Sequence, residues 1–114
     1  MDIQNNIIDL VQHQLQEFCE RRVPLHVRNQ VKLSYSSRGD TVTLYEERVH
    51  FRDSSKWTKT SIAQFRFNPD TKEWILYCSD RNSRWHIYNL TKPTKDFVSL
   101  LKFVDEDSTG IFWG

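Results

Sequence analysis

The chain has 114 residues, 27% of them charged and 38% hydrophobic, with a formal net charge of +1. This composition excludes a disordered or fibrous chain, and the length is enough to bury one core without a metal or disulfide staples. We therefore predict a single domain over residues 1–114. No apolar run is long enough for a membrane helix, and the first residues lack the basic and apolar regions of a secretory signal. We expect a cytoplasmic protein with no membrane partner.

The cysteines and histidines indicate neither a metal site nor a cofactor. Cys19 and Cys78 fall on different predicted elements, and none of the four histidines forms a closely spaced pair with another ligand. We predict reduced thiols, with a disulfide between them as the weaker alternative. His86 could act as a base for Cys78 across a hairpin, but an inert buried thiol fits the apolar strand around Cys78 better.

The first third of the chain predicts a helix and two strands. Apolar residues recur at spacings of three and four over residues 3–21, with Asp2 as the cap, and Pro24 ends the helix. Residues 25–35 alternate between apolar and polar, which predicts a half-buried strand. Residues 36–40 then form a hairpin loop, and a second strand covers 41–52. Its apolar residues change from even to odd positions at Tyr45–Glu47, where we expect a β-bulge or a bend.

The middle of the chain predicts an antiparallel meander and most of the core. Three short β-type runs, near 59–67, 73–79 and 84–89, are separated by turn signals at 68–70 and 80–83. The run Trp74–Cys78 is apolar at every position, so we expect this strand in the interior of the sheet or covered on both faces.

The last third predicts a second helix and a closing segment. Thr94 is the expected cap, and Phe97, Leu100, Leu101 and Val104 form one apolar face. We expect the acidic residues 105–107 just beyond the helix, because acids are unfavourable at its C-terminus. The aromatic end, 111–114, predicts a tail docked in a groove. The fold class is therefore α+β: an N-terminal helix, a five-stranded antiparallel β-meander, and a C-terminal helix with a docked aromatic tail.

A series of aromatic and charged residues along the chain resembles one protein family. The series consists of Glu47-Arg48, Trp57, Ile62-Ala63-Gln64-Phe65-Arg66, Trp74-x-Leu76-Tyr77, Asp80-x-Asn82-x-Arg84-Trp85-x-x-Tyr88 and Gly110-Ile111-Phe112-Trp113-Gly114. It resembles the small bacterial proteins catalogued as domain of unknown function 3024, over nearly the whole chain. The resemblance implies a bacterial, cytoplasmic, one-domain protein, and it implies no activity, ligand or catalytic residue.

The distribution of charge is the strongest functional signal. Residues 21–95 carry fifteen Lys and Arg against seven acids, a net +8, whereas both ends of the chain are acidic. If the helices cover one face of the sheet, the other face can bind nucleic acid or another polyanion, since cations neutralise phosphates and aromatic rings stack on bases. The candidate residues are Arg28, Lys32, Arg48, Arg52, Trp57, Arg66, Arg84, Trp85 and Tyr88. The competing interpretation is that these arginines pair with neighbouring acids and the tryptophans are core.

Two further functions remain as alternatives. The aromatic tail could anchor a partner protein, although docking on its own core is the stronger interpretation. A metal-dependent hydrolase would need converging carboxylates, for which Glu46, Glu47 and Asp70 are candidates, with His50 and Lys72 beside them. Glu46 and Glu47 point to opposite faces of a regular strand, and Asp70 more plausibly caps its own turn. We therefore favour a non-enzymatic binding module.

Overall fold

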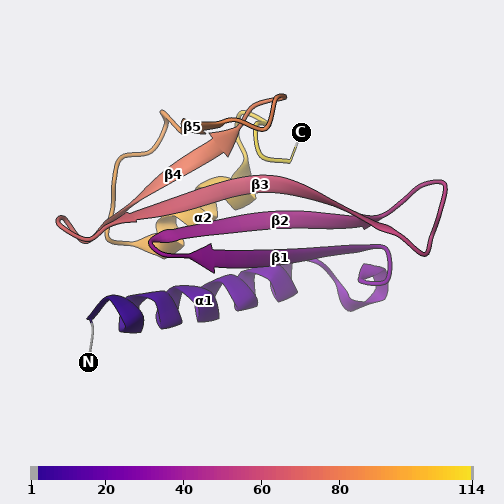
Figure 1. Cartoon of the computed structure of the whole chain (residues 1–114), viewed down its shortest axis with the longest axis horizontal. Coiled ribbons are helices and arrows are strands. Elements are labelled where there is room, and N and C mark those ends of the chain that lie inside the picture. The colour runs from indigo at the N-terminus through magenta and orange to yellow at the C-terminus, as the bar shows by residue number, and fades with distance from the viewer. Residues whose placement is uncertain (1–2, 114) are drawn as a thin grey trace. The chain divides into compact units, whose positions relative to one another are not determined.

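The computed structural model describes residues 3–113, and their side chains from residue 7 onward. The cap predicted at Asp2 and the last residue of the tail, Gly114, lie outside the described residues. The elements in chain order are α1 (Ile3–Arg22), a 3-10 helix η1 (Leu25–Val27), β1 (Val31–Arg38), β2 (Thr41–Val49), β3 (Trp57–Asn68), β4 (Glu73–Ser79), β5 (Trp85–Ile87) and α2 (Phe97–Glu106) (Figure 1). The strands form one five-stranded sheet in sequence order. The predicted α+β meander is confirmed.

The chain divides into two compact units. Unit 1 holds the chain up to Tyr35 and Tyr45–Thr60, and unit 2 holds Ser36–Leu44 and the chain from Ser61 onward. Strands β1, β2 and β3 each have residues in both units. The single domain over residues 1–114 stays a prediction.

The predicted first strand begins too early. Residues 24–30 form successive tight turns, with the amide of Val27 donating to the carbonyl of Pro24 at 3.1 Å and that of Gln30 to Val27 at 2.9 Å. The Arg28 side chain also donates to two carbonyls around the end of α1, those of Glu20 and Val23. These local bonds hold residues 24–30 in turns, so β1 starts only at Val31 and Leu25 is 79% exposed.

Both loops of the first two hairpins differ from the prediction. Ser36–Arg38 belong to β1, which leaves a two-residue loop, Gly39–Asp40, in which Gly39 has φ +58°. Glycine takes this conformation without the strain that a Cβ would bring. At its other end β2 stops at Val49 rather than Arg52, because residues 50–56 form a loop closed by the bond from the His50 amide to the Lys56 carbonyl, 2.9 Å.

The hairpin of β2 and β3 carries an extra residue, but not where the sequence indicated. The Phe67 amide donates to the Asp40 carbonyl at one end, and the His50 amide donates to the Lys56 carbonyl at the other. The stretch of β2 between these two bonds, from Asp40 to His50, is one residue shorter than the stretch of β3 opposite it, from Lys56 to Phe67. A regular antiparallel ladder keeps the two stretches equal, so the extra residue lies on the β3 side. The prediction placed it at Tyr45–Glu47 of β2.

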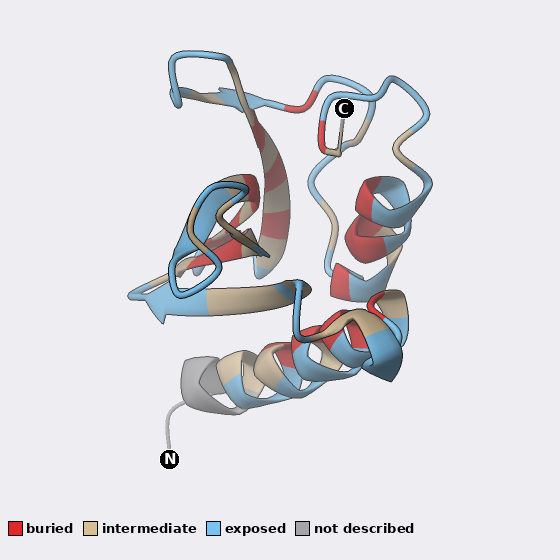
Figure 2. Ribbon diagram, turned by 90° about the vertical axis from the view of Figure 1, so that its right-hand side faces the viewer, coloured by how far each residue is buried: buried red, intermediate tan, exposed pale blue. Residues whose placement is uncertain are grey.

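The core of unit 2 lies between the β3–β4 ladder and α2. Phe65 pairs with Leu76 and Phe67 with Trp74, so their side chains share one face of the sheet. The Phe97 ring of α2 lies 4.7 Å from the Phe65 ring and 5.1 Å from that of Trp74. Figure 2 shows the result as alternating buried and half-buried bands along β4. The interior position predicted for β4 is confirmed, with its second face half-buried.

Both ends of α2 depart from the prediction. The N-cap is Asp96, whose carboxylate accepts from the Ser99 amide, while the Thr94 hydroxyl accepts from the amide of Asp96 itself. At the other end Asp105 and Glu106 lie inside the helix, and only Asp107 lies beyond it, with φ +45°.

The tail folds back onto unit 2. The Asp107 carboxylate accepts from the Phe112 amide at 3.0 Å and the Trp113 amide at 2.9 Å. The Trp113 indole donates to the Val104 carbonyl at 2.7 Å, which satisfies a group that the helix end leaves open. Phe112 is 5% exposed and its ring lies 5.0 Å from that of Tyr88. The docked tail is confirmed, and a partner protein held by it stays a prediction.

Candidate nucleic-acid interface and a cavity beside the tail

Four side chains of unit 1 form what we call the cation–π face: Lys32, Tyr45, Trp57 and Lys59. The Lys32 ammonium lies 4.6 Å from the centre of the Trp57 ring, and the Lys59 ammonium lies 4.2 Å from that of Tyr45. Trp57 and Lys59 are two residues apart on β3, so they share a side of the strand. Their contacts place Lys32 of β1 and Tyr45 of β2 on that same side.

This face is open to solvent and mildly positive. Both lysines are exposed, Trp57 is 39% exposed and Tyr45 is half-buried. One carboxylate belongs to the same neighbourhood, because Glu47 follows Tyr45 by two residues on β2. The two ammonium groups therefore exceed the acidic charge by one, and each already lies against an aromatic ring.

The loop that joins β2 to β3 presents a second aromatic group. Phe51 is 85% exposed, although its side chain is large and apolar. Its ring stacks on that of His50 at 5.0 Å with 21° between the planes, and the Arg52 guanidinium lies 5.1 Å from its centre. The loop also lines a hollow of about 550 Å³ together with Asn29, Gln30 and Arg48.

Two of the predicted arginines, both in unit 1, form hydrogen bonds with other groups of the protein. Arg28 lies in the turn after η1, not on a strand face, and its guanidinium bonds two backbone carbonyls. Arg48 is on β2 as predicted, but its guanidinium makes two hydrogen bonds to Glu46, at 2.7 and 3.3 Å. This hydrogen-bonded ion pair raises the pKa of Arg48 above its usual value. Pairing with a neighbouring acid, the competing interpretation, therefore describes Arg48, whereas Arg28 is bonded to backbone carbonyls instead.

Arg66, the predicted arginine of β3, lies in unit 2. Its guanidinium lies 3.8 Å from the centre of the Tyr77 ring on β4 and donates to the Gln64 side chain at 2.7 Å. The Gln64 amide donates in turn to the Thr43 hydroxyl, 3.1 Å away. This chain of contacts spans β2, β3 and β4, and it holds Arg66 flat against the sheet.

The remaining predicted residues lie at the β4–β5 hairpin and differ in exposure. Arg84 is exposed in the turn, and Trp85 is half-buried at the start of β5. Tyr88 was predicted to face a ligand on the sheet surface, and this placement is wrong, because only 4% of it is exposed and its ring packs on Phe112. The docked tail, rather than solvent, covers this tyrosine.

Sequence reasoning missed Tyr45 and Lys59. Tyr45 lies where the apolar residues of the second strand change from even to odd positions, so the sequence could not show which face of the sheet its side chain is on. Lys59 lies two residues after Trp57, so strand alternation was the signal that would have placed the two together. The alternation was not applied to this pair, because the strand was predicted to begin near residue 59, after Trp57.

Two of the residues proposed for a hydrolase are bonded to local partners. Glu46 is bound to Arg48, and the His50 ring accepts from the Arg52 amide at 3.2 Å. The turn at 68–70 is capped by the Asn68 side chain, which accepts from the Asp70 amide, so the cap predicted at Asp70 is wrong. Among the described residues, no group of three or more His, Cys, Asp or Glu lies close enough to hold a metal ion.

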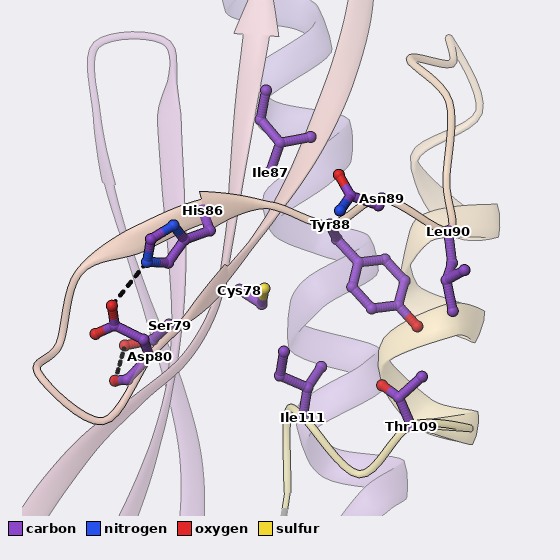
Figure 3. Close-up of a pocket in the computed structure, with 10 residues that line it drawn as sticks. All are labelled: Cys78, Ser79, Asp80, His86, Ile87, Tyr88, Asn89, Leu90, Thr109 and Ile111. Carbon is purple, nitrogen blue, oxygen red and sulfur yellow. Dashed lines mark hydrogen bonds and ion pairs between the residues drawn. The ribbon is translucent and has the colours of Figure 1, made fainter.

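A cavity of about 440 Å³ lies in unit 2 between β5 and the tail (Figure 3). Its walls include the aliphatic side chains of Ile87, Leu90 and Ile111, each about half exposed. Asp80 and His86 lie together at one end, and Tyr88 lies on the opposite side next to Leu90 and Thr109. The Tyr88 hydroxyl is covered by protein and has no hydrogen-bond partner among residues 3–113.

Asp80 is the most strongly perturbed acid near this cavity. One of its oxygens lies 2.7 Å from the His86 Nε2, and the other accepts from the amides of Asn82 at 2.8 Å and Arg84 at 3.0 Å. The hydrogen bond to His86, followed by that from Arg84, lowers the pKa of Asp80 from its usual 3.8 to about 2. The carboxylate is therefore ionised and fully occupied by groups of its own hairpin.

This shift predicts an acid-dependent contribution to stability. Because the pKa of Asp80 is lower in the folded chain than in the unfolded chain, the ionised carboxylate stabilises the fold above pH 3.8, and the contribution disappears as the pH falls toward about 2. Melting temperatures measured between these pH values should show Asp80→Asn less stable than the wild type at the upper end, and the two converging at the lower end. A constant difference across this range would contradict the assignment.

The two thiols are free, buried and poor nucleophiles. Burial, assisted by the charge of Glu20, raises the pKa of Cys19 to about 11. Burial likewise raises the pKa of Cys78, although Cys78 is directly opposite His86 in the β4–β5 ladder. A thiol with a raised pKa remains protonated at neutral pH, so the arrangement favours the inert interpretation over a Cys–His pair.

One comparison with known proteins is informative. Residues 3–114 match the family described as "Domain of unknown function (DUF3024)". The chain belongs to this family. No curated protein and no solved structure matches it. Within the described residues, no helix is both long and apolar enough to cross a membrane. The family description names no activity, so the function has to be argued from the surfaces described above.

Proposed function

We propose that this chain is a non-enzymatic module that binds single-stranded nucleic acid through the cation–π face of unit 1. The observation that carries the proposal is the pairing of two exposed lysines with two aromatic rings across three adjacent strands. Phosphates need cations and unpaired bases need ring faces, and this face offers both within one small area.

The energies favour an exchange of partners on binding. A cation–π contact at an exposed site stabilises by about 0.5–1 kcal/mol. Stacking of a base on an aromatic side chain contributes about 1–3 kcal/mol. When a single-stranded nucleic acid binds, each lysine can move from its ring to a phosphate, and a base can stack on Trp57 or Tyr45 in its place. The free energy gained by stacking and phosphate binding then exceeds that of the lost cation–π contact.

The loop of residues 50–56 supports the same proposal. Phe51 offers a further ring to solvent, with Arg52 beside it. Trp57 follows directly after this loop. A single-stranded nucleic acid that runs from the cation–π face to the loop would therefore meet aromatic and cationic groups in turn. Arg28, Arg48 and Arg66 are not needed, since each is already bonded within the chain.

We also propose a bacterial, cytoplasmic setting. The bacterial origin rests on the resemblance described above. The location rests on the two free thiols, since cysteines stay reduced in the cytosol and tend to form disulfides in oxidising compartments.

The proposal is tested by fluorescence-anisotropy titration of the full chain with short single- and double-stranded DNA and RNA at two salt concentrations. We expect single strands to bind more tightly, because paired bases cannot stack on protein rings. Trp57→Ala should weaken single-strand binding by about 5- to 150-fold, which corresponds to the loss of one stacked base. Lys32→Gln combined with Lys59→Gln should lower the salt slope by about 1.4, or 0.7 for each lost phosphate contact.

A matched control separates the face from the overall charge. Lys92→Gln combined with Lys95→Gln removes the same charge from exposed positions of unit 2, and it should leave the affinity nearly unchanged. Glu47→Gln should strengthen binding, because it removes the acid of the face. Equal losses in the two double variants, or no binding at low salt, would overturn the proposal.

A further inference from the structure

We propose that the cavity of unit 2 is a binding site for a small neutral molecule with an apolar body and one hydroxyl or carbonyl oxygen. This site is separate from the cation–π face, and neither proposal depends on the other. The cavity of about 440 Å³ lies within the usual range for small-molecule sites, about 300–1,000 Å³. Three aliphatic side chains, Ile87, Leu90 and Ile111, surround it without packing on one another tightly enough to be buried.

The Tyr88 hydroxyl is the observation that points to a ligand. It is covered by protein and makes no hydrogen bond to any residue that the structure describes, and such orphaned groups are uncommon in folded proteins. Figure 3 shows the hydroxyl directed toward the side of the cavity where Leu90 and Thr109 lie. Leu90 is 58% exposed, so its side chain can turn away and open the hydroxyl to the cavity. A ligand oxygen at this point would supply the missing partner.

The charges around the cavity select a neutral ligand. Both oxygens of Asp80 are occupied, by His86 on one side and by two backbone amides on the other. The unsatisfied polar group at the opposite side is the Tyr88 hydroxyl, which can donate or accept a hydrogen bond. A charged ligand would lose its hydration without gaining an ionic partner, whereas a hydroxyl or carbonyl needs only a neutral partner.

The test follows the methyl signals of Ile87, Leu90 and Ile111 by NMR while phenol or toluene is titrated into the full chain. The two probes share one ring, and only phenol has an oxygen. We expect saturable shifts with both, and about 2- to 12-fold tighter binding of phenol, which is the contribution of one net hydrogen bond. In Tyr88→Phe the preference for phenol should disappear while the affinity for toluene stays the same.

Further variants keep the test decisive if Tyr88→Phe is poorly folded. Ile111→Trp fills the cavity from an exposed position and should abolish binding of both probes. Val98→Trp places the same ring on an exposed site of α2 outside the cavity and should leave binding intact. The proposal is overturned by the absence of saturable shifts, by equal affinity of the wild type for both probes, or by benzoate binding more tightly than phenol.

Discussion

Trp74→Ala should lower the free energy of unfolding by about 3–5 kcal/mol, the range found for large aromatic side chains removed from a core. Trp74 is 2% exposed, and its ring contacts those of Phe67 at 4.9 Å and Phe97 at 5.1 Å. Its backbone also exchanges two hydrogen bonds with Thr94, which fixes the segment leading into α2. Because small domains are stable by only about 5–15 kcal/mol, the loss would remove about a fifth or more of the total.

Urea denaturation followed by far-UV circular dichroism measures this effect. Trp74→Phe is the matched control, since it keeps an aromatic ring against Phe97 and should lose clearly less stability than the alanine variant. Amide exchange should speed up across α2 in Trp74→Ala, because the helix loses its contact with β4. A loss below about 1.5 kcal/mol, the level of a conservative core substitution, would show that Trp74 does not hold α2 on the sheet.

Asp107→Ala should lower the free energy of unfolding by about 2–4 kcal/mol and release the tail. The carboxylate accepts two backbone hydrogen bonds, and a net bond to a charged group stabilises by about 1.5–3 kcal/mol. Alanine is also strained at φ +45°, a conformation that Asp and Asn adopt more readily. Once the tail is released, Phe112 no longer covers Tyr88.

Hydrogen exchange of the Phe112 and Trp113 amides is the direct measurement. Both amides should be protected in the wild type and exchange rapidly in Asp107→Ala. Asp107→Asn keeps the backbone conformation and one carbonyl oxygen, so it should show intermediate protection and a smaller loss of stability. Unchanged protection in Asp107→Ala would mean that the Trp113 indole bond and the packing of Phe112 hold the tail without the carboxylate.

The outline of the fold was predictable because its signals are local. The alternation around Phe65 and Phe67, the apolar run of β4 and the spacing of Phe97, Leu100, Leu101 and Val104 each describe one element that the structure contains. The errors arose where a local hydrogen bond outweighed a pattern. Arg28 and the turns after Pro24 replaced the start of the first strand, and Asp96 replaced Thr94 as the cap of α2.

The candidate site was less predictable, because it depends on which side chains meet. Lys32 and Trp57 were both among the predicted residues, but their contact joins β1 to β3, and no sequence spacing shows it. Arg48 and Arg28 are of a residue type that binds phosphates. Only the structure shows that the Arg48 guanidinium is already bonded to Glu46, and that of Arg28 to two backbone carbonyls. The cavity was not predicted at all, since its walls come from β5 and from a tail more than twenty residues later.

The sequence alone therefore determined the order and type of the elements, the apolar faces that make the core and the excess of positive charge in the middle of the chain, because periodicity and composition are properties of neighbouring residues. Only the tertiary structure decided which cations stay available, where Tyr88 lies and how the tail closes. One extra residue on the β3 side of the β2–β3 hairpin changes which side chains of the two strands lie opposite each other. A long-range hydrogen bond such as that of Asp107 to the tail leaves no trace in the spacing of the residues.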